Sequence, residues 1–207
     1  DYVDFNIQRL GLWLKYNQKS AISRNEWEVL KVESMPELKG KLTVGVKFGH
    51  DSVNASVSVA VKTAADSVFI ETIDCRSVRD GNEWILAFIR SADIDNVIVD
   101  GDAGKAILAE MMKKAGLPGP HIVKPAEVVA ASSMFEQAVV SGSISHKGQP
   151  ALARVVTNCE HRNIGTGGGF GYKSILAGAD ISIMESAILA HWGCKEAKEK
   201  KQQKISY

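Results

Sequence analysis

Three aspartates lie at the ends of predicted elements, where carboxylates often do chemistry in α/β proteins. Asp100 ends the apolar run NVIVD, Asp102 follows it by two residues, and Asp180 opens the last predicted helix. Ligands of α/β sheets collect at the carboxyl ends of the parallel strands, so Asp100 stands at a favoured place. Grouped carboxylates suit hard cations such as Mg²⁺ or Mn²⁺. Two such ions can activate a water and stabilise the leaving oxygen of a phosphodiester.

The same aspartates have a simpler interpretation as helix caps. Asp100 could cap the next helix through the turn GDAG, and Asp180 could cap the last helix, because aspartate is a preferred N-cap residue. Glu185 lies five residues beyond Asp180, more than one helical turn away, and is expected on the surface. The sequence alone leaves both interpretations of Asp100 and Asp180 open.

The spacing of other residues argues against nucleotide and zinc motifs. The stretch GDAGK resembles part of a P-loop, but that motif needs glycine where Val99 stands and Ser or Thr where Ala106 stands. The glycine-rich GTGGGFG lacks the GxGxxG arrangement and is expected to form a hairpin or loop. No zinc site is expected either, because three of the histidines are isolated from one another and from cysteine pairs: His146, His161 and His191.

Four basic residues are candidates for contacts with a nucleic-acid backbone: Lys147, Arg154, Arg162 and Lys173. They fall in a polar turn, the helix after it and the glycine-rich segment, where Lys and Arg side chains could meet phosphates. The alternative for each is an ordinary solvated surface position. Lys173 is the one that we favour for a DNA contact.

Composition limits the function classes only weakly. The chain has 207 residues, 45% hydrophobic, with a net charge of +1, which fits one sizeable domain and requires no nucleic-acid partner. Three well-separated cysteines without a CxxC pair indicate a reducing cytoplasm. We expect no membrane span and no signal peptide. The first residue is Asp1, which suggests a piece of a longer protein.

The hydrophobic pattern predicts a mixed α/β domain. Residues 41–48 and 53–61 alternate apolar and polar side chains around a GHDS turn, which indicates a β-hairpin, and a third strand follows at 67–74. The later predicted elements are a helix capped by Asp80, a strand at 96–100, a helix at 103–115, a short strand HIVK, and helices at 125–141, from 150 to about 162, and from 181. Three consecutive strands followed by alternating helices and strands are the order of the ribonuclease H-like fold. It is a mixed β-sheet of three antiparallel strands and then parallel strands, flanked by helices.

The expected domain organisation has three parts. Residues 1–40 form a linker or arm that packs on the domain, with Ser23 as a helix N-cap and Trp13 and Trp27 as anchors. Residues 41–193 form the ribonuclease H-like domain. Residues 194–207 form a charged C-terminal tail.

The second half of the chain resembles a known family. The stretch FEQAVVSGSISHKGQPALARVVTNCEHRNIGTGGGFGYK, continued by ADISIMESAILAHWG, is similar to the C-terminal half of the nuclease domain of tailed-phage terminase large subunits. That family has a helix, a "g.l.H.g.p.L" turn, a helix with Asn, a basic position and an "iD...A..LA" helix in this order. The arm FNIQRLGLWLKYNQKSAISRNEWEVL resembles the linker before that domain.

The resemblance implies a divalent-metal-dependent endonuclease that cuts concatemeric viral DNA with two Mg²⁺ or Mn²⁺ ions. It places the family's acidic residues at Asp100 and Asp180 and its basic position at Lys173, and implies that all three are catalytic. The first acidic position falls on Lys47, in VGVKFG, where the family has a pattern like "vgvDls". This sequence departs from the family there.

A lysine cannot ligate a metal, because an ammonium group has three donors and no lone pair. Three explanations of Lys47 stay open. Asp51, in the turn after the strand, could supply the missing carboxylate. Lys47 could instead pair with Asp100 and Asp180 and leave a weak or inactive enzyme, a catalytically impaired module for DNA binding or motor docking. Finally, the lysine could be an introduced substitution.

The resemblance also implies partners and a location. Double-stranded DNA would be the substrate, and an N-terminal ATPase motor domain, a small terminase subunit and a portal would be the protein partners. The expected place is the cytoplasm of an infected bacterial host, with no membrane partner.

Overall fold

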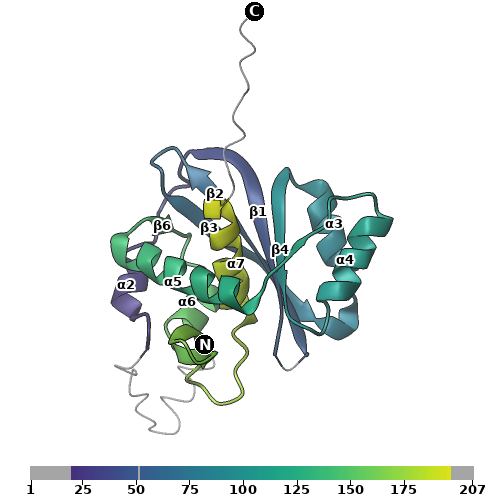
Figure 1. The fold of residues 1–207 in the computed structure, drawn as a ribbon. Coiled ribbons are helices and arrows are strands. Elements are labelled where there is room, and N and C mark those ends of the chain that lie inside the picture. The colour runs from purple at the N-terminus through teal and green to yellow at the C-terminus, as the bar shows by residue number, and fades with distance from the viewer. Residues whose placement is uncertain (1–19, 51, 197–207) are drawn as a thin grey trace, which may run out of the picture.

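A six-stranded mixed sheet, in the order β5-β4-β1-β2-β3-β6, organises the part of the chain that the structure describes, residues 20–50 and 52–196 (Figure 1). This structure is a computed structural model. The strands are β1 (Leu38–Phe48), β2 (Asn54–Thr63), β3 (Val68–Ser77), β4 (Ile94–Asp100), β5 (His121–Ile122) and β6 (Ile144–Ser145). The first three strands are antiparallel neighbours, while β4 pairs in parallel with β1, β5 with β4, and β6 with β3. The predicted ribonuclease H-like arrangement of strands is confirmed.

Alternation along β1 gives the two faces of the sheet different roles. Val44, Val46 and Phe48 are fully buried in the hydrophobic cluster on the side of α3 (Glu83–Ser91) and α4 (Lys105–Lys114). Successive side chains of a strand point to opposite faces, so Gly45 and Lys47 face the other side. That side carries α7 (Ser182–Glu196), which contacts β1 and β2.

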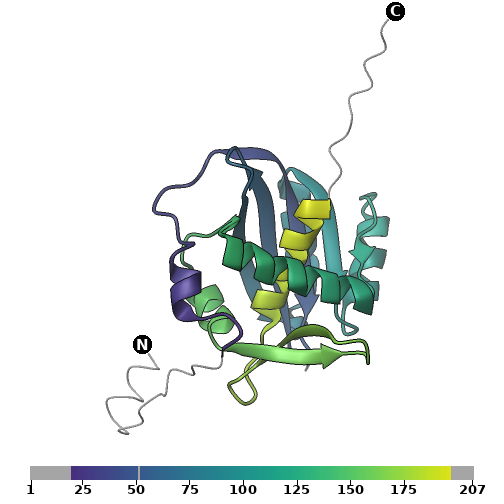
Figure 2. The same cartoon turned by 60° about the vertical axis from the view of Figure 1, so that its left-hand side comes forward.

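The remaining helices form the layer that covers α7. Figure 2 shows α5 (Pro125–Ser141) lying across α7, with the hairpin of β7 (Cys159–Ile164) and β8 (Gly169–Ser174) beneath it. The helices α6 (Pro150–Val156) and α2 (Arg24–Glu28) pack beside them. The larger hydrophobic cluster lies between this layer and the sheet. Among the described residues, no helix has the length and apolar character that a membrane span needs.

The described part of the segment before β1 contacts the domain through α2. Ser23 caps α2 in a capping box with Glu26, since each side chain bonds the other's backbone N–H. Trp27 is buried and stacks on the ring of His146, with ring centroids 4.1 Å apart. The second predicted anchor, Trp13, lies outside the described residues.

Two predicted boundaries are wrong. The helix from Pro150 ends at Val156 instead of reaching residue 162, because the side chains of Thr157 and Asn158 bond carbonyls of its last turn and the chain then enters β7. The N-cap of α3 is Asn82, whereas Asp80 ends a short 3₁₀ helix, Val78–Asp80.

The last helix extends past residue 193, after which the charged tail was expected to begin. Helix α7 continues to Glu196, so it includes the first three residues of the expected tail, and Cys194 is buried. The expected hairpin in the glycine-rich segment is present, with its turn between β7 and β8.

Candidate active site

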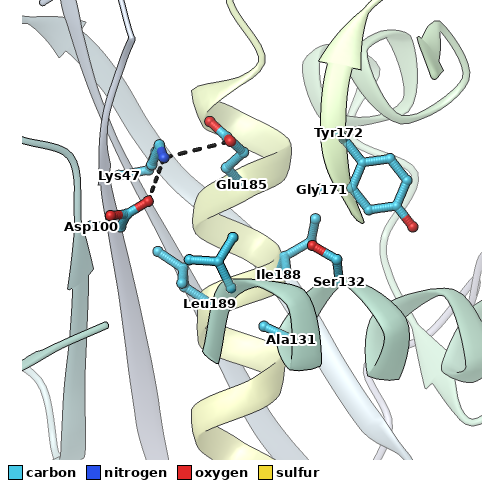
Figure 3. Close-up of a pocket in the computed structure, with 10 residues that line it drawn as sticks. Lys47, Asp100, Ala131, Ser132, Gly171, Tyr172, Glu185, Ile188 and Leu189 are labelled. Carbon is cyan, nitrogen blue, oxygen red and sulfur yellow. Dashed lines mark hydrogen bonds and ion pairs between the residues drawn. The ribbon is translucent and has the colours of Figure 1, made fainter. Parts of the chain in front are cut away.

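The centre of the candidate site is an ion pair at the carboxyl ends of two parallel strands. Lys47 on β1 lies directly opposite Asp100 on β4 in the sheet register. Both side chains point to the α7 face, and the Lys47 Nζ donates to the Asp100 Oδ2 at 2.5 Å (Figure 3). The Lys47 side chain is only 5% exposed, and that of Asp100 is 21% exposed. Asp100 therefore binds the lysine, and α4 has no side-chain cap.

Helix α7 lies unusually close to the sheet because small residues face it. A Cβ atom on Gly45 would lie 2.1 Å from the backbone oxygen of Ser186, so only glycine allows this contact. Buried hydroxyl pairs then fix the position of the helix: Ser182 bonds Ser56 across 2.6 Å, and Ser186 bonds Ser58 across 2.7 Å. These contacts fix which side of α7 faces the end of β1.

Glu185 is the third charged member of the site, and the expectation that it lies on the surface is wrong. Helix α7 begins at Ser182, so Glu185 falls in its first turn and points towards β1 (Figure 3). Its Oε1 lies 3.5 Å from the Lys47 Nζ, and its side chain is 11% exposed. One sequence signal could have found it: Glu185 is the one charged residue between Asp180 and Lys195. A single charged residue in a largely apolar helix that packs on the core is expected to have a partner of opposite charge.

A second cation completes the cluster. Arg162 on β7 lies 3.9 Å from the Glu185 carboxylate and also donates to the backbone oxygen of Tyr172 at 3.0 Å. Burial raises the pKa of Glu185, while the positive charges of Lys47 and Arg162 lower it and Asp100 raises it. The site thus contains two carboxylates and two cationic side chains in close reach of one another.

The space beside these charges is small. The cavity lined by Lys47, Asp100 and Glu185 has a volume of about 10 Å³, and its other walls are mostly apolar residues of α5, β8 and α7. That volume matches about one water molecule. A group larger than a water molecule therefore does not fit inside this cavity as it stands.

The other predicted acidic residues in the described part of the chain make no ion pair with Lys47, although Asp180 is linked through Ser182 to Ser56, which lies opposite Lys47 on β2. Asp180 accepts hydrogen bonds from the backbone N–H and the hydroxyl of Ser182 and from the Asn54 amide at 3.4 Å, so it caps the start of α7. It lines a different groove from that of Lys47. Asp102 is 96% exposed and pairs with Lys105 at 2.5 Å. The prediction for Asp51 lies outside the described residues.

The four predicted DNA-binding residues lie on different elements. Of these four, only Arg162 contacts the charged cluster of Lys47, Asp100 and Glu185. Lys173 on β8 is exposed and pairs with Glu160 at 3.0 Å. Arg154 is exposed on α6, and the Lys147 Nζ donates to the backbone oxygen of Glu33 at 2.5 Å.

The described residues do not fit a divalent metal ion in their present arrangement. Within residues 20–50 and 52–196, no group of three or more His, Cys, Asp or Glu side chains could hold a metal. Only Asp100 and Glu185 share the cavity, and the Lys47 ammonium already lies between them. A cation next to that ammonium would be repelled.

Comparisons of sequence give no match, either with a family model or with a curated protein. Comparisons of structure do. The large terminase of bacteriophage HK97 superposes with a TM-score of 0.67 at 14% identity, over 84% of this chain and 43% of that one. The large terminase nuclease from thermophilic phage G20c with bound magnesium gives 0.57 at 17% identity, over 84% and 97%. A variant nuclease domain of the large terminase subunit of bacterial virus Sf6, with manganese and beta-thujaplicinol, gives 0.56 at 13% identity, over 83% and 98%.

The coverage values show which part of these proteins resembles this chain. The chain spans less than half of the HK97 protein but nearly the whole of the isolated nuclease domains. Helices, strands and sheet order agree with the ribonuclease H-like expectation. This chain has the fold of the nuclease domains of phage terminase large subunits.

Proposed function

We propose that this chain is the nuclease-type domain of a phage DNA-packaging terminase large subunit, and that Lys47 blocks metal-dependent cutting in it. The family function would be divalent-metal-dependent cleavage of concatemeric viral DNA. The observation that carries the proposal is the Lys47 ammonium, which lies 2.5 Å from Asp100 and 3.5 Å from Glu185. A tethered monovalent cation neutralises these carboxylates where the fold would otherwise gather ligands for Mg²⁺ or Mn²⁺.

Double-stranded DNA is the proposed partner of the blocked domain. The exposed residues Lys173 and Arg154 would bind its phosphates. Lys147 and Arg162 would add contacts, and Arg162 also lies beside Glu185. Each phosphate that is neutralised on duplex DNA contributes about 0.9 to the slope of log affinity against log salt. By the same family resemblance, an ATPase motor domain, a small terminase subunit and a portal would be its protein partners, in the cytoplasm of an infected bacterium.

A second candidate is an active endonuclease in which Lys47 withdraws and a cation binds between Asp100 and Glu185. The observation in its favour is that one ammonium nitrogen already reaches both carboxylates. The solved domains of phages G20c and Sf6 carry magnesium and manganese respectively. In this chain, Asp180 and Asp51 would have to supply the remaining carboxylates.

Plasmid cleavage separates the two candidates. Supercoiled DNA is incubated with Mg²⁺ or Mn²⁺ and with the parent chain, Lys47→Asp, or Lys47→Asp combined with Asp100→Asn. We expect no cutting by the parent, cutting by Lys47→Asp, and none by the double variant. Lys41→Asp is the matched control, because Lys41 lies on the same strand and its side chain is 53% exposed.

The other results have clear meanings. Cutting by the parent that is lost in Asp100→Asn supports the second candidate. If neither the parent nor Lys47→Asp cuts with any metal, while both bind DNA in a salt-dependent manner, the acidic cluster is no remnant of a metal site. The proposed role then reduces to DNA binding.

A further inference from the structure

A groove lies on the side of the domain where α6, the segment 174–181 and the start of α7 meet. Its volume is about 280 Å³. Six of its lining residues are apolar: Ala151, Val155, Leu176, Ala179, Ile181 and Ile183. The other four are polar: Arg154, Asn158, Ser174 and Asp180. A groove with this lining would gain free energy by covering its apolar surface.

The described part of the chain begins at the edge of this groove. The Ser20 hydroxyl donates to the backbone oxygen of Cys159 at 3.1 Å, and the Ala21 N–H donates to the same oxygen at 2.8 Å. Cys159 follows Asn158, which lines the groove. The residues before Ser20 therefore start next to it.

The segment before Ser20 has a composition that matches the groove. Its stretch FNIQRLGLWL carries six large apolar side chains, and the last three residues are Leu12, Trp13 and Leu14. Leu14 stands six positions before Ser20, and an extended chain of that length reaches about 20 Å. Trp13 can thus reach the groove without any change in the described residues.

The other tryptophan of the same arm shows how such an anchor binds. Trp27 is 1% exposed and lies against His146 and Phe135, and through it α2 is held to the domain. A tethered segment also has an effective concentration in the millimolar range, which favours it over a separate partner.

We propose that residues Leu12–Leu14 of this chain bind in the groove between α6 and α7, with Trp13 as the buried anchor. The arm then holds the domain at two places, Trp27 on the α5 side and Trp13 at the start of α7. This proposal does not depend on the activity of the Lys47 cluster.

Disulfide trapping in the full chain tests the contact. Lys15→Cys is combined with Ala179→Cys at the groove, in a Cys75→Ser background, and oxidised under mild conditions. The matched control pairs Lys15→Cys with Ala65→Cys, in the exposed turn between β2 and β3. That turn lies at the end of β2 opposite to Asn54, which contacts Asp180, roughly 30 Å away along the strand.

We expect an intramolecular disulfide for the groove pair and none for the control pair. Trp13→Ala should slow its formation roughly tenfold, which corresponds to about 1.4 kcal/mol, whereas Trp13→Phe should slow it less. Equal trapping of both pairs, or of neither pair in a chain with parent-like circular dichroism, overturns the proposal. Disulfide-linked dimers would assign the groove to a second copy of the chain and also overturn it.

Discussion

Replacing Lys47 with methionine should destabilise the domain at pH 7 by about 3 kcal/mol. Methionine keeps most of the volume of the side chain but leaves the carboxylates of Asp100 and Glu185 without their shared ammonium. Removing one partner of a buried ion pair costs roughly 3–5 kcal/mol. The lower end applies here because Asp100 is 21% exposed and Arg162 still faces Glu185.

Urea unfolding at pH 7 measures this effect. With a slope of about 1–3 kcal/mol per molar urea, the midpoint should fall by roughly 1–3 M. Lys41→Met is the matched control, since its pair with Asp93 is exposed and its loss should change the midpoint little.

The pH dependence of the stability difference between Lys47→Met and the parent is the most specific test. Burial raises the pKa of Glu185, and Lys47 is the strongest charge that lowers it, so the pKa should rise further in Lys47→Met. A carboxyl group with a raised folded pKa binds its proton more tightly in the folded state. The cost of ionising it is absent below its unfolded pKa, near 4.5, and grows as the pH rises towards the folded pKa.

The difference in stability between Lys47→Met and the parent should therefore shrink as the pH is lowered from 7 to about 4.5. A loss no larger than that of Lys41→Met, or a difference that does not change with pH, would refute the idea that Lys47 neutralises a buried acidic pair.

Three further predictions follow from buried groups. Neither ring nitrogen of the buried His191 has a hydrogen-bond partner among the described residues, and burial lowers the pKa of this histidine to about 4. About 3 kcal/mol of stability should therefore be lost as the pH falls from 6.5 to 4, and His191→Leu should remove this loss in acid unfolding curves. Gly45→Ala should cost about 3 kcal/mol or prevent folding because its Cβ would collide with α7. Gly119→Ala should leave the melting temperature unchanged, because no described residue beyond its two chain neighbours lies within 4 Å of the added Cβ. Ellman's reagent should modify Cys75 quickly in the native chain but not Cys159, which is buried and whose pKa is raised to about 11; rapid reaction of Cys159 would contradict the packing around it.

The order of strands and helices along the chain could be predicted because it depends on local patterns. Alternation in β1 and β2, the apolar run of β4 and the caps of α2 and α5 all agree with the global fold. The end of α6 could not be predicted from periodicity, since Thr157 and Asn158 end it through their own side chains.

The site was predictable only in part, for a physical reason. Asp100 and Lys47 come from strand ends, and strand ends have a fixed place in this fold. The position of Glu185 depends instead on how α7 is rotated, which is set by Gly45 and by hydroxyl pairs with β2 across the interior. Contacts between residues so distant in sequence leave no local pattern.

The borders of the sheet have a consequence for assembly. Both outermost strands, β5 and β6, have only two residues, and each leads into or out of the long helix α5. Each outermost strand therefore offers at most two residues for pairing with a strand of another molecule. Any ordered assembly by strand pairing would have to use the outer sides of β3 and β4, because β6 pairs only with Val68 and Phe69 and β5 only with Ile98 and Val99.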